Sequence, residues 1–289
     1  MIKCIICNRT QKYLFTYHKS FFYYICTSCV LVSTYPLPTV KMIKEHYKEK
    51  FRQGNYQLLR EYSDQYKKVY ENFAAELERA LIDKKINFGE LKVLDIGCFT
   101  GEFLEILQRK GADVYGIELQ KEAVEIANKK LGGRVYKADI MDNEFPNMNF
   151  DIISLLGLIE HVTDPIRLLK KCSDLLKKNG IIFIQTPNSG SLFARIMRKY
   201  WPPYTPIEHI HLFSRSSLES VLKKEQFTNI TFKQSWKKLP IGYVFDMLQN
   251  FGPEFYRIVK PFARIVHKIG KNISLPFYIG EMIIIAKKK

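Results

Sequence analysis

Three acidic residues of this chain each close a short apolar run, and together they suggest a bound nucleoside. Asp95, Glu118 and Asp139 end three successive runs that are predicted to be β-strands. Glu118 lies roughly 20 residues after the turn that follows Asp95, where nucleotide-binding folds hold a ribose diol with a carboxylate. Asp139 can accept a hydrogen bond from an adenine amino group while Ile140 packs on the ring. Asp95 precedes the turn, where a negative charge disfavours a pyrophosphate.

The segment after Asp95 is predicted to be a tight turn between a strand and a helix. Glycine permits the backbone conformation of such a turn and lets backbone N–H groups approach a ligand closely. The helix N-terminus that follows favours a negative group. We expect the cofactor-binding residues to be Asp95, Gly97, Cys98, Phe99, Gly101, Glu118, Leu119, Asp139, Ile140 and Leu156.

Two groups of histidines lie where a second substrate would bind in such a fold. His161 follows the fourth predicted strand, and Glu208, His209 and His211 lie in the long segment after the fifth. Loops at the carboxyl ends of the strands carry the binding residues of open α/β sheets, so both groups can reach one site. Histidine titrates near neutrality, which makes each a candidate general base, with Glu208 beside them as a catalytic residue. The alternatives are a structural role, loop hydrogen bonding, or a metal site of Glu208, His209 and His211.

Four cysteines near the N-terminus have the spacing of a structural zinc site. Cys4-x-x-Cys7 is followed 18 residues later by Cys26-x-x-Cys29, which fits two turns that each offer two thiolates. Such a short segment cannot build an adequate core, so the metal would supply folding energy. Disulfides are the alternative, which a cytosolic compartment disfavours.

From residue 89 onward, apolar strands and helical segments alternate, which predicts an α/β fold with a doubly wound, Rossmann-like sheet of seven strands. We expect three parts: a zinc ribbon over 1–35, a helical linker or lid over 36–88, and a domain over 89–289 with a helical insertion at about 236–278. The sequence also predicts a helix from the Asp164 cap to 178–180 and one that begins after Ser214.

The glycine turn and the strand-end acids together resemble class I S-adenosylmethionine (SAM)-dependent methyltransferases, over about residues 90–235 and a last strand near 280–287. The family's turn is usually acid-x-Gly-x-Gly-x-Gly; Gly97 and Gly101 match it, and Phe99 replaces the middle glycine. The resemblance implies SAM as the cofactor, with Asp95 near the amino group of its methionyl end. The Gly-x-Gly-x-x-Gly of Rossmann dehydrogenases is absent.

Two narrower resemblances point to different acceptors. A four-cysteine module fused to such a domain resembles the sugar C-methyltransferases that act on nucleotide-linked deoxysugars. Glu208-His209 matches their Glu-His pair and His161 a further active-site histidine, although Pro206 stands where they carry a tyrosine. Those enzymes carry a second C-terminal domain, and the shorter arrangement expected here is similar to methyltransferases encoded with polysaccharide biosynthesis enzymes. Glu160-His161 and the basic insertion are similar to the ubiquinone-pathway O-methyltransferases, which work at membranes.

Charge is concentrated toward the C-terminus. The net charge is +16, and residues 190–289 carry 17 Lys and Arg against 6 Asp and Glu. Within the insertion, basic residues recur at helical spacing opposite an apolar stripe, which predicts a helix that either lies on an anionic membrane or packs on its own domain. These basic residues are Arg257, Lys260, Arg264, Lys268 and Lys271.

We therefore expect a SAM-dependent methyltransferase that acts on a sugar or glycan precursor by O- or C-methylation. The alternatives are an isoprenoid-quinone or lipid O-methyltransferase at a membrane surface, and a zinc-ribbon nucleic-acid-binding protein with a degenerate SAM site. The sequence shows no apolar run of about 18 residues and no signal-peptide core. We expect a cytoplasmic protein with a small-molecule or glycan acceptor and no nucleic-acid partner, or one that also contacts the inner membrane face through the insertion.

Overall fold

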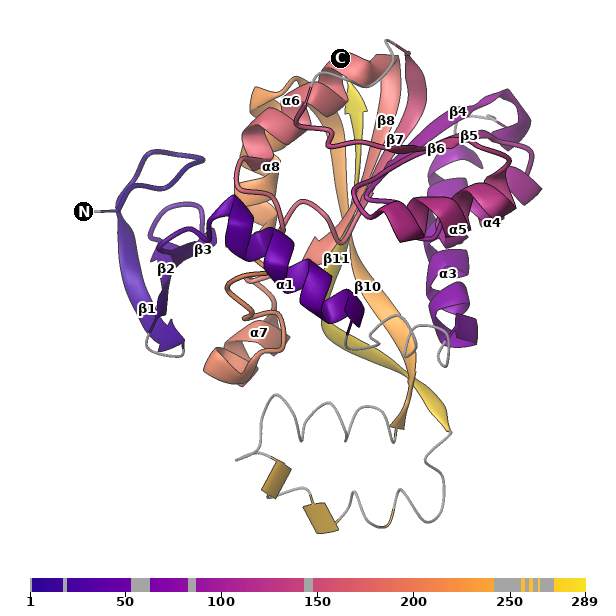
Figure 1. The fold of residues 1–289 in the computed structure, drawn as a ribbon. Helices are drawn as coiled ribbons and strands as arrows, with labels where there is room; N and C mark the ends of the chain where they lie inside the picture. The colour runs from indigo at the N-terminus through magenta and orange to yellow at the C-terminus, as the bar shows by residue number, and fades with distance from the viewer. Residues whose placement is uncertain are drawn as a thin grey trace.

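The computed structural model describes residues 2–17, 20–52, 63–82, 87–142, 148–241, 256–257, 260–261, 265 and 273–289. A sheet of seven strands forms its centre and a smaller sheet of four strands lies at the N-terminal side (Figure 1). In spatial order the large sheet contains β10 (Phe227–Pro240), β11 (Ser274–Lys288), β8 (Leu176–Pro187), β7 (Phe150–Leu156), β4 (Lys92–Ile96), β5 (Asp113–Glu118) and β6 (Val135–Lys137). The strands from β8 to β6 are parallel, and β11 and β10 are antiparallel. The predicted seven-stranded α/β sheet is confirmed.

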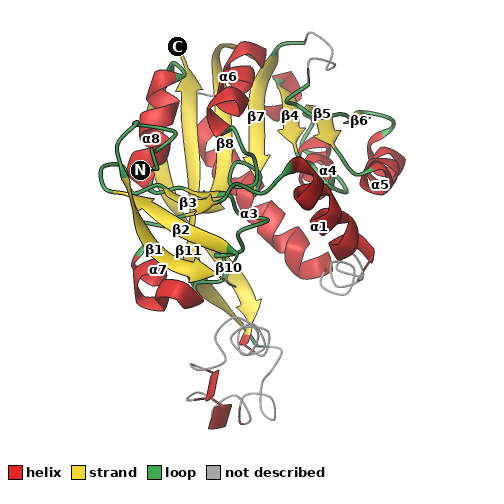
Figure 2. Cartoon of the chain, turned by 60° about the vertical axis from the view of Figure 1, so that its left-hand side comes forward, coloured by secondary structure: helices red, strands yellow, loops and turns green. Residues whose placement is uncertain are grey.

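Helices cover both faces of this sheet (Figure 2). On one face the apolar sides of α3 (Ser63–Ile82), α4 (Glu102–Arg109) and α5 (Lys121–Leu131) pack with one set of strand side chains, among them Val93 and Phe183. On the other face α6 (Pro165–Leu175) and α8 (Arg215–Lys224) pack with the alternate set, among them Leu94 and Ile184. Because successive strand residues point to opposite faces, the central parallel strands β8, β7 and β4 are buried on both sides.

The smaller sheet joins distant parts of the chain. It consists of β1 (Gln11–Tyr17), β2 (Phe21–Cys26), β3 (Val32–Tyr35) and β9 (His211–Leu212), all antiparallel. The structure also contains α1 (Val40–Arg52), α7 (Leu192–Met197) and the 3-10 turns η1 (Phe88–Glu90) and η2 (Arg198–Tyr200). The pairing of β3 with β9 ties the cysteine-containing segment to the segment that carries the second histidine group. The boundaries of the three predicted parts stay a prediction.

The two helix N-caps predicted from the sequence are present in the structure, whereas the predicted C-terminal end of one of these helices is wrong. Asp164 accepts a hydrogen bond from the N–H of Arg167, and Ser214 forms a capping box with Ser217. Helix α6 ends at Leu175, not at 178–180 as predicted. The chain enters β8 at Leu176 because that residue already pairs with Phe150 of β7. Pairing within the sheet therefore ends the helix before the local Asn-Gly signal is reached.

The predicted helical insertion is shorter than expected at both ends. Residues 236–240 belong to β10 and residues 274–278 to β11, and the two strands pair as far as Pro240 and Ser274. The antiparallel pairing of β10 with β11 therefore occupies both ends of the segment that was predicted to be helical. Arg257 and Lys260 are described as helical, whereas Arg264, Lys268 and Lys271 lie outside the described residues, so the basic stripe stays a prediction. Within the described part of the chain, no helix has the length and apolar character needed to cross a membrane.

Gly101, at the start of α4, provides a test of the turn. Its φ is +80°, and a Cβ there would meet Leu131 Cδ1 at 2.9 Å and Ala127 Cβ at 3.2 Å. Gly101→Ala is expected to lower the free energy of unfolding by about 2–3 kcal/mol, from the left-handed backbone and the crowding together. Gly132 has a φ of +65° and open space around it, so Gly132→Ala is expected to cost only about 1 kcal/mol. Equal losses in urea unfolding would contradict the crowding at Gly101.

Candidate active site

The three strand-end acids lie on neighbouring strands of the large sheet. Asp95 is in β4, Glu118 ends β5, and Asp139 follows β6. These strands are adjacent and parallel, so their carboxyl ends share one edge of the sheet. Ligands of open α/β sheets bind at this edge.

Asp95 is the most deeply buried of the three acids. Its side chain is 2% exposed, and Oδ1 accepts a hydrogen bond from the hydroxyl of Ser154 on β7 at 2.6 Å. Burial raises the pKa of Asp95 to about 7, with a lesser rise from Glu118, against the lowering effect of the Ser154 hydrogen bond. A cationic group nearby would stabilise the ionised form. Contact of Asp95 with the amino group of SAM stays a prediction.

Glu118 links its own strand to the glycine turn. Its carboxylate accepts hydrogen bonds from the backbone N–H of Phe99 at 3.1 Å and of Gln120 at 2.8 Å. Burial raises the pKa of Glu118, and these backbone hydrogen bonds act in the opposite direction. The half-buried carboxylate is thus held in place, and each oxygen keeps a lone pair for a diol hydroxyl.

Phe99 adopts the backbone conformation that the turn demands, although it replaces a glycine. The φ of Phe99 is +48°. The glycines two residues before and after it also have positive φ, +76° at Gly97 and +80° at Gly101. A left-handed conformation costs roughly 1–2 kcal/mol for a residue with a side chain, and the Phe99–Glu118 hydrogen bond helps to hold it. Phe99 thus has a positive φ at the position where the family's turn usually carries its middle glycine.

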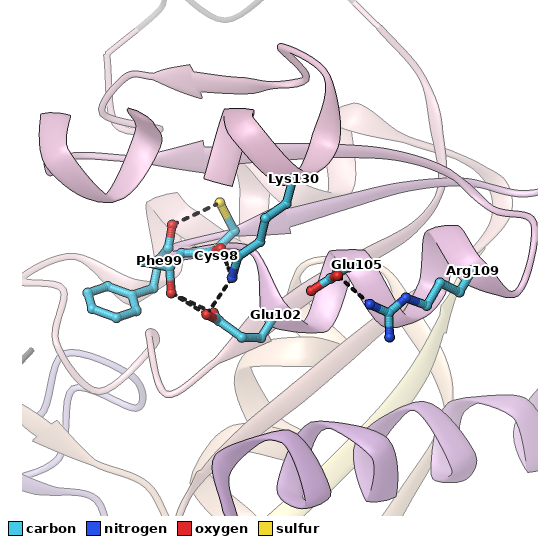
Figure 3. A network of polar contacts seen from close by, with 7 residues as sticks. Cys98, Phe99, Glu102, Glu105, Arg109 and Lys130 are labelled. Atoms are coloured by element: carbon cyan, nitrogen blue, oxygen red, sulfur yellow. Dashed lines mark hydrogen bonds and ion pairs between the residues drawn. The ribbon is translucent and has the colours of Figure 1, made fainter. Parts of the chain in front are cut away.

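An ion pair between Lys130 of α5 and Glu102 of α4 stabilises the helix side of the glycine turn (Figure 3). Lys130 Nζ donates to the Thr100 carbonyl at 3.1 Å and to Glu102 at 2.8 Å, and the Thr100 hydroxyl donates to Glu102. The ring of Phe99 points away from this pair. The turn is therefore fixed on its helix side, while Phe99 faces the other way.

The apolar members of the predicted set differ in exposure. Leu119 is 58% exposed, which is unusual for a leucine beside a buried strand, whereas Ile140 is 7% exposed and Leu156 is half-buried. An exposed Leu119 next to the Glu118 carboxylate fits a site where an aromatic ring covers the leucine and the carboxylate binds a sugar. The Asp139 carboxylate accepts a hydrogen bond from the N–H of Met141 at 2.9 Å.

Cys98 has a packing role beside this site. It is 6% exposed, and a Cβ on Gly116 would lie 2.6 Å from its sulfur. Burial raises the pKa of its thiol, with further rises from Asp95 and Glu118, so the thiolate is disfavoured. Cys98 therefore packs beside the turn as a buried, protonated thiol.

A second cluster contains Glu160, His161 and His209, and it joins loops that follow β7 and β8. One ligand-capable atom of each residue lies within 4.8 Å of those of the others, and the two imidazole rings are 4.8 Å apart at 63°. The Thr186 hydroxyl donates to Glu160, and burial raises the pKa of this carboxyl to about 8. The cluster has the donor set of a divalent metal site and also that of a proton-transfer site.

The hydrogen bonds of His209 determine its tautomer. Its Nδ1 lies 2.7 Å from the carbonyl oxygen of Pro203 and 3.1 Å from Thr205 Oγ1. A carbonyl oxygen only accepts, so Nδ1 carries the proton and donates it. In the neutral ring Nε2 then holds a lone pair, which is the form that a general base requires.

Of the residues Glu208, His209 and His211, which were predicted to act together, only His209 joins this cluster within the described residues. His211 is 1% exposed and both of its ring nitrogens are engaged, Nδ1 with Ser33 Oγ at 3.0 Å and Nε2 with the Thr163 carbonyl at 3.3 Å. Burial lowers its pKa to about 4. The prediction of a catalytic His211 is therefore wrong, because the side chain has no nitrogen left to take a substrate proton.

Glu208 also lies apart from the predicted arrangement. Its carboxylate is 3.9 Å from His46 of α1. Within the described residues, His209 shares a possible ligand set with Glu160 and His161, and the alternative metal set with Glu208 and His211 is wrong. This pair connects α1 to the loop over 203–211, and the lid role of the segment over 36–88 stays a prediction.

The four N-terminal cysteines come together as predicted. The sulfur pairs lie 3.4 Å (Cys7–Cys26), 3.6 Å (Cys4–Cys29) and 3.7 Å (Cys7–Cys29) apart, and none is bonded to another. Four sulfurs about 2.3 Å from a central zinc ion in a tetrahedron would be about 3.8 Å apart. The N–H groups of Ser28 and Cys29 point to the sulfur of Cys26, as expected around a thiolate. Hydrogen bonding from Cys29 lowers the pKa of Cys4 to about 5. These residues fit a zinc ion.

Sequence reasoning missed several supporting residues. Ser154 is a buried polar residue within the apolar run of β7, which is a usable signal for a partner of a strand-end acid. Glu160 was recognised only as part of a Glu-His pair. Thr186 and Thr205 gave no signal, because only the folded chain brings them to Glu160 and His209.

Taken together, the doubly wound sheet, the glycine turn and the acids at three adjacent strand ends define an α/β protein that binds a nucleoside-containing cofactor. Residues 59–231 match the family model of a methyltransferase domain, which is more than half of the chain. The chain belongs to this family, and it is a SAM-dependent methyltransferase.

Individual relatives agree with this family. The ubiquinone biosynthesis O-methyltransferase of Pelagibacter ubique (strain HTCC1062) is 32% identical over 194 residues, which cover 63% of this chain and 76% of that protein. The protein of the same name from Actinobacillus pleuropneumoniae serotype 5b (strain L20) is 34% identical over 119 residues, 37% of this chain and half of its own length. The crystal structure of a SAM-dependent methyltransferase from Archaeoglobus fulgidus superposes with a TM-score of 0.51 at 23% identity, covering 76% of this chain and 94% of that one, and shows the shared fold.

Removal of the Glu118 carboxylate is expected to weaken SAM binding. Glu118→Ala should raise the Kd for SAM about 10- to 100-fold, because the ribose loses a charged acceptor worth roughly 1.5–3 kcal/mol. Glu122→Ala, an acid on the neighbouring helix α5, is the matched control and should leave the Kd within twofold of wild type. Isothermal titration calorimetry measures both, and an unchanged Kd for Glu118→Ala would remove this residue from the site.

The raised pKa of Asp95 predicts a pH-dependent stability of the protein without SAM. The folded-state pKa lies above the unfolded value, so the stability contribution of Asp95 falls as the pH rises from about 4 to about 7. Asp95→Asn should therefore become more stable relative to wild type across this window, by at most about 1.4 kcal/mol per pH unit. Urea unfolding at pH 5, 6 and 7 measures the difference, and a difference that does not change with pH contradicts the prediction.

Proposed function

We propose that this protein transfers the methyl group of SAM to a hydroxyl group of a small acceptor, with His209 as the general base. The observation that carries the proposal is the Nδ1–H donation from His209 to the Pro203 carbonyl, which leaves Nε2 free of a proton. SAM, when bound, supplies a methyl group on a cationic sulfur. His209 takes the hydroxyl proton as the oxygen forms its bond to the methyl carbon, and the electrons of the broken carbon–sulfur bond remain on a neutral thioether.

His161 and Glu160 complete the acceptor side of this proposal. The ring of His161 packs against that of His209, and the buried Glu160 lies 3.8 Å from His161 Nε2. These contacts orient the base, because Glu160 is only 2% exposed and so has a fixed place behind His161. The acids Asp95, Glu118 and Asp139 hold the donor at the neighbouring strand ends, which brings the two substrates together.

For the acceptor we infer a hydroxylated isoprenoid-quinone or lipid-linked precursor rather than a sugar. The relatives that match this chain carry the name ubiquinone biosynthesis O-methyltransferase. An exposed apolar surface near α7 is compatible with an acceptor that resides in a membrane. Leu192 and Ile196 on α7 are 71% and 69% exposed, and they alternate with the exposed cations Arg195, Arg198 and Lys199.

The ends of β10 and β11 add to this α7 surface. Trp201 next to α7 donates to the Ile279 carbonyl of β11 at 3.1 Å, and α7 lies beside these strands in both views (Figures 1 and 2). Trp236, Ile273 and Leu275 are also exposed there. No Asp or Glu occurs in 191–204, 227–240 or 273–280. Apolar side chains among cations are the composition that binds an anionic membrane peripherally.

The acceptor class is tested by mass spectrometry of the methylated product. The enzyme is incubated with methyl-labelled SAM and a panel of polyprenyl catechols, short-chain catechols and nucleotide sugars. A gain of one labelled methyl on a catechol oxygen supports the proposal, whereas methylation of nucleotide sugars alone overturns it. Binding to anionic vesicles is measured in parallel with Leu192→Ser/Ile196→Ser, and Tyr13→Ser, another exposed apolar residue, is the control.

A sugar or glycan precursor is the second candidate acceptor. The observation that favours it is the four-cysteine module packed against the loop of His209, since this combination resembles the sugar methyltransferases.

We also propose that Cys4, Cys7, Cys26 and Cys29 bind one structural zinc ion, which the distances between their sulfurs support.

A further inference from the structure

The cysteine module contacts the acceptor loop through paired strands. Strand β3 pairs with β9, with Ser33 opposite His211 and Val32 opposite Leu212. The N–H of Thr34 donates to the Ile210 carbonyl at 3.0 Å, next to His209. The module thus forms main-chain hydrogen bonds within one residue of the proposed base.

A chain of side-chain hydrogen bonds crosses the same junction. Gln11 Nε2 donates to Ser33 Oγ at 3.4 Å, and His211 lies between Ser33 Oγ and the Thr163 carbonyl. A carbonyl only accepts, so His211 Nε2 carries the proton and Nδ1 accepts from the Ser33 hydroxyl. Every donor in this chain therefore has one acceptor, and the chain runs from β1 to the loop after β7.

The backbone of the histidine segment is fixed to that same loop. The N–H groups of Ile210 and His211 both donate to the Glu160 carbonyl, at 2.8 and 3.2 Å. His161 follows Glu160 directly, and His209 precedes Ile210. The separation of the two imidazole rings is thus determined by bonds that include Ser33 and His211.

The turn of Cys29 is attached to the beginning of α8 as well. The Cys29 carbonyl accepts hydrogen bonds from the hydroxyls of Ser214 at 2.7 Å and Ser216 at 3.0 Å. Glu118, in contrast, ends β5 and Asp139 follows β6, and β7 and β4 separate these two strands from β8 in the large sheet. The module is therefore connected to the acceptor half of the site and lies away from the ribose and adenine half.

We propose that the four-cysteine module forms part of the acceptor site, and that Ser33 and His211 are positioning residues that transmit its fold to His209. This inference rests on the proposed role of His209 as the base. Loss of the Ser33–His211 hydrogen bond lets the segment over 208–212 shift relative to Glu160 and His161. Acceptor turnover then falls while the donor half of the site keeps its geometry.

Ser33→Ala is the primary test, because it removes one oxygen and leaves all four cysteines in place. We expect kcat/KM for the acceptor to fall at least tenfold, and the Kd for S-adenosylhomocysteine to stay within twofold of wild type. Ser33→Thr retains the hydroxyl and should restore turnover. Thr27→Ala is the matched control, since it removes a hydroxyl of the same module that bonds to the Thr10 carbonyl, away from β9.

Hydrogen exchange provides a readout that needs no acceptor. Amides of residues 208–212 should exchange at least fivefold faster in Ser33→Ala than in Thr27→Ala, and amides of β4 and β5 should be unchanged. Equal exchange in the two variants would overturn the inference, as would a parallel loss of S-adenosylhomocysteine affinity. If the acceptor panel yields no product, the exchange result still decides whether the module holds this segment, and the proposed function fails separately.

Discussion

Replacement of His209 by alanine is expected to lower kcat by about 10²- to 10⁴-fold, because a positioned general base contributes an effect of this size. The Kd for SAM should stay near the wild-type value, since His209 lies in a loop after β8 and the donor residues lie at the ends of β4, β5 and β6. Steady-state kinetics with the acceptor from the product screen, together with calorimetry for SAM, measure the two quantities.

His46→Ala is the matched control for this variant. His46 is a half-buried histidine of α1 that contacts Glu208 and lies outside the Glu160–His161–His209 cluster. We expect its kcat to stay within about tenfold of wild type, because no proton transfer is assigned to it. A His209→Ala enzyme with kcat close to that of His46→Ala would show that His209 is not the base, and the O-methylation proposal would lose its main support.

Replacement of Cys29 by serine is expected to abolish zinc binding and to destabilise the N-terminal module. Cys29 lies within 3.7 Å of the sulfurs of both Cys4 and Cys7, so its loss opens the tetrahedral site. Structural zinc sites contribute about 10–16 kcal/mol of apparent binding free energy, and we expect the module to lose at least ~3 kcal/mol of stability. Zinc content by plasma mass spectrometry and limited proteolysis at residues 1–35 measure these effects.

Cys172→Ala tests whether this effect is specific to the cluster. Cys172 is fully buried in α6 among the residues of the main core and does not belong to the set of four cysteines whose sulfurs come together. This variant should lose some overall stability through the cavity it creates and keep one zinc ion per chain. Wild-type protein that contains no zinc after expression in zinc-supplemented medium would contradict the zinc proposal.

Loss of the zinc ion and loss of the Ser33–His211 hydrogen bond should have related consequences. The zinc site determines the turn that contains Cys29, and β3 begins three residues later at Val32. Cys29→Ser should therefore also reduce acceptor turnover more than SAM affinity. The Ser33 variants separate the two causes, because they alter the junction without removing a thiolate.

Much of the donor half was predictable because its signals are local. A strand that ends in an acid, a turn with Gly97 and Gly101, and a helix that begins directly afterwards are all specified within a dozen residues. The backbone of this turn requires positive φ, which restricts the residue types that can occupy it. The next two acids follow from the regular alternation of strands and helices, which places their carboxyl ends at one edge of a parallel sheet.

The acceptor half was less predictable because its contacts connect residues far apart in sequence. His209 and His211 are two residues apart and looked equivalent, yet one borders His161 and the other is buried between Ser33 and Thr163. That difference depends on the pairing of β9 with β3, which joins residues 178 positions apart. The long pairing of β10 with β11 likewise shortened the predicted insertion.

The sequence by itself determined the seven-stranded α/β architecture, the glycine turn after β4 and the cysteine spacing, because strand alternation, glycine conformation and metal-ligand spacing are short-range properties. Only the tertiary structure decided which histidine joins Glu160 and His161, which is hydrogen-bonded through both ring nitrogens, and where the cysteine module attaches. Those outcomes depend on desolvation and on hydrogen-bond partners that the chain supplies only after it has folded.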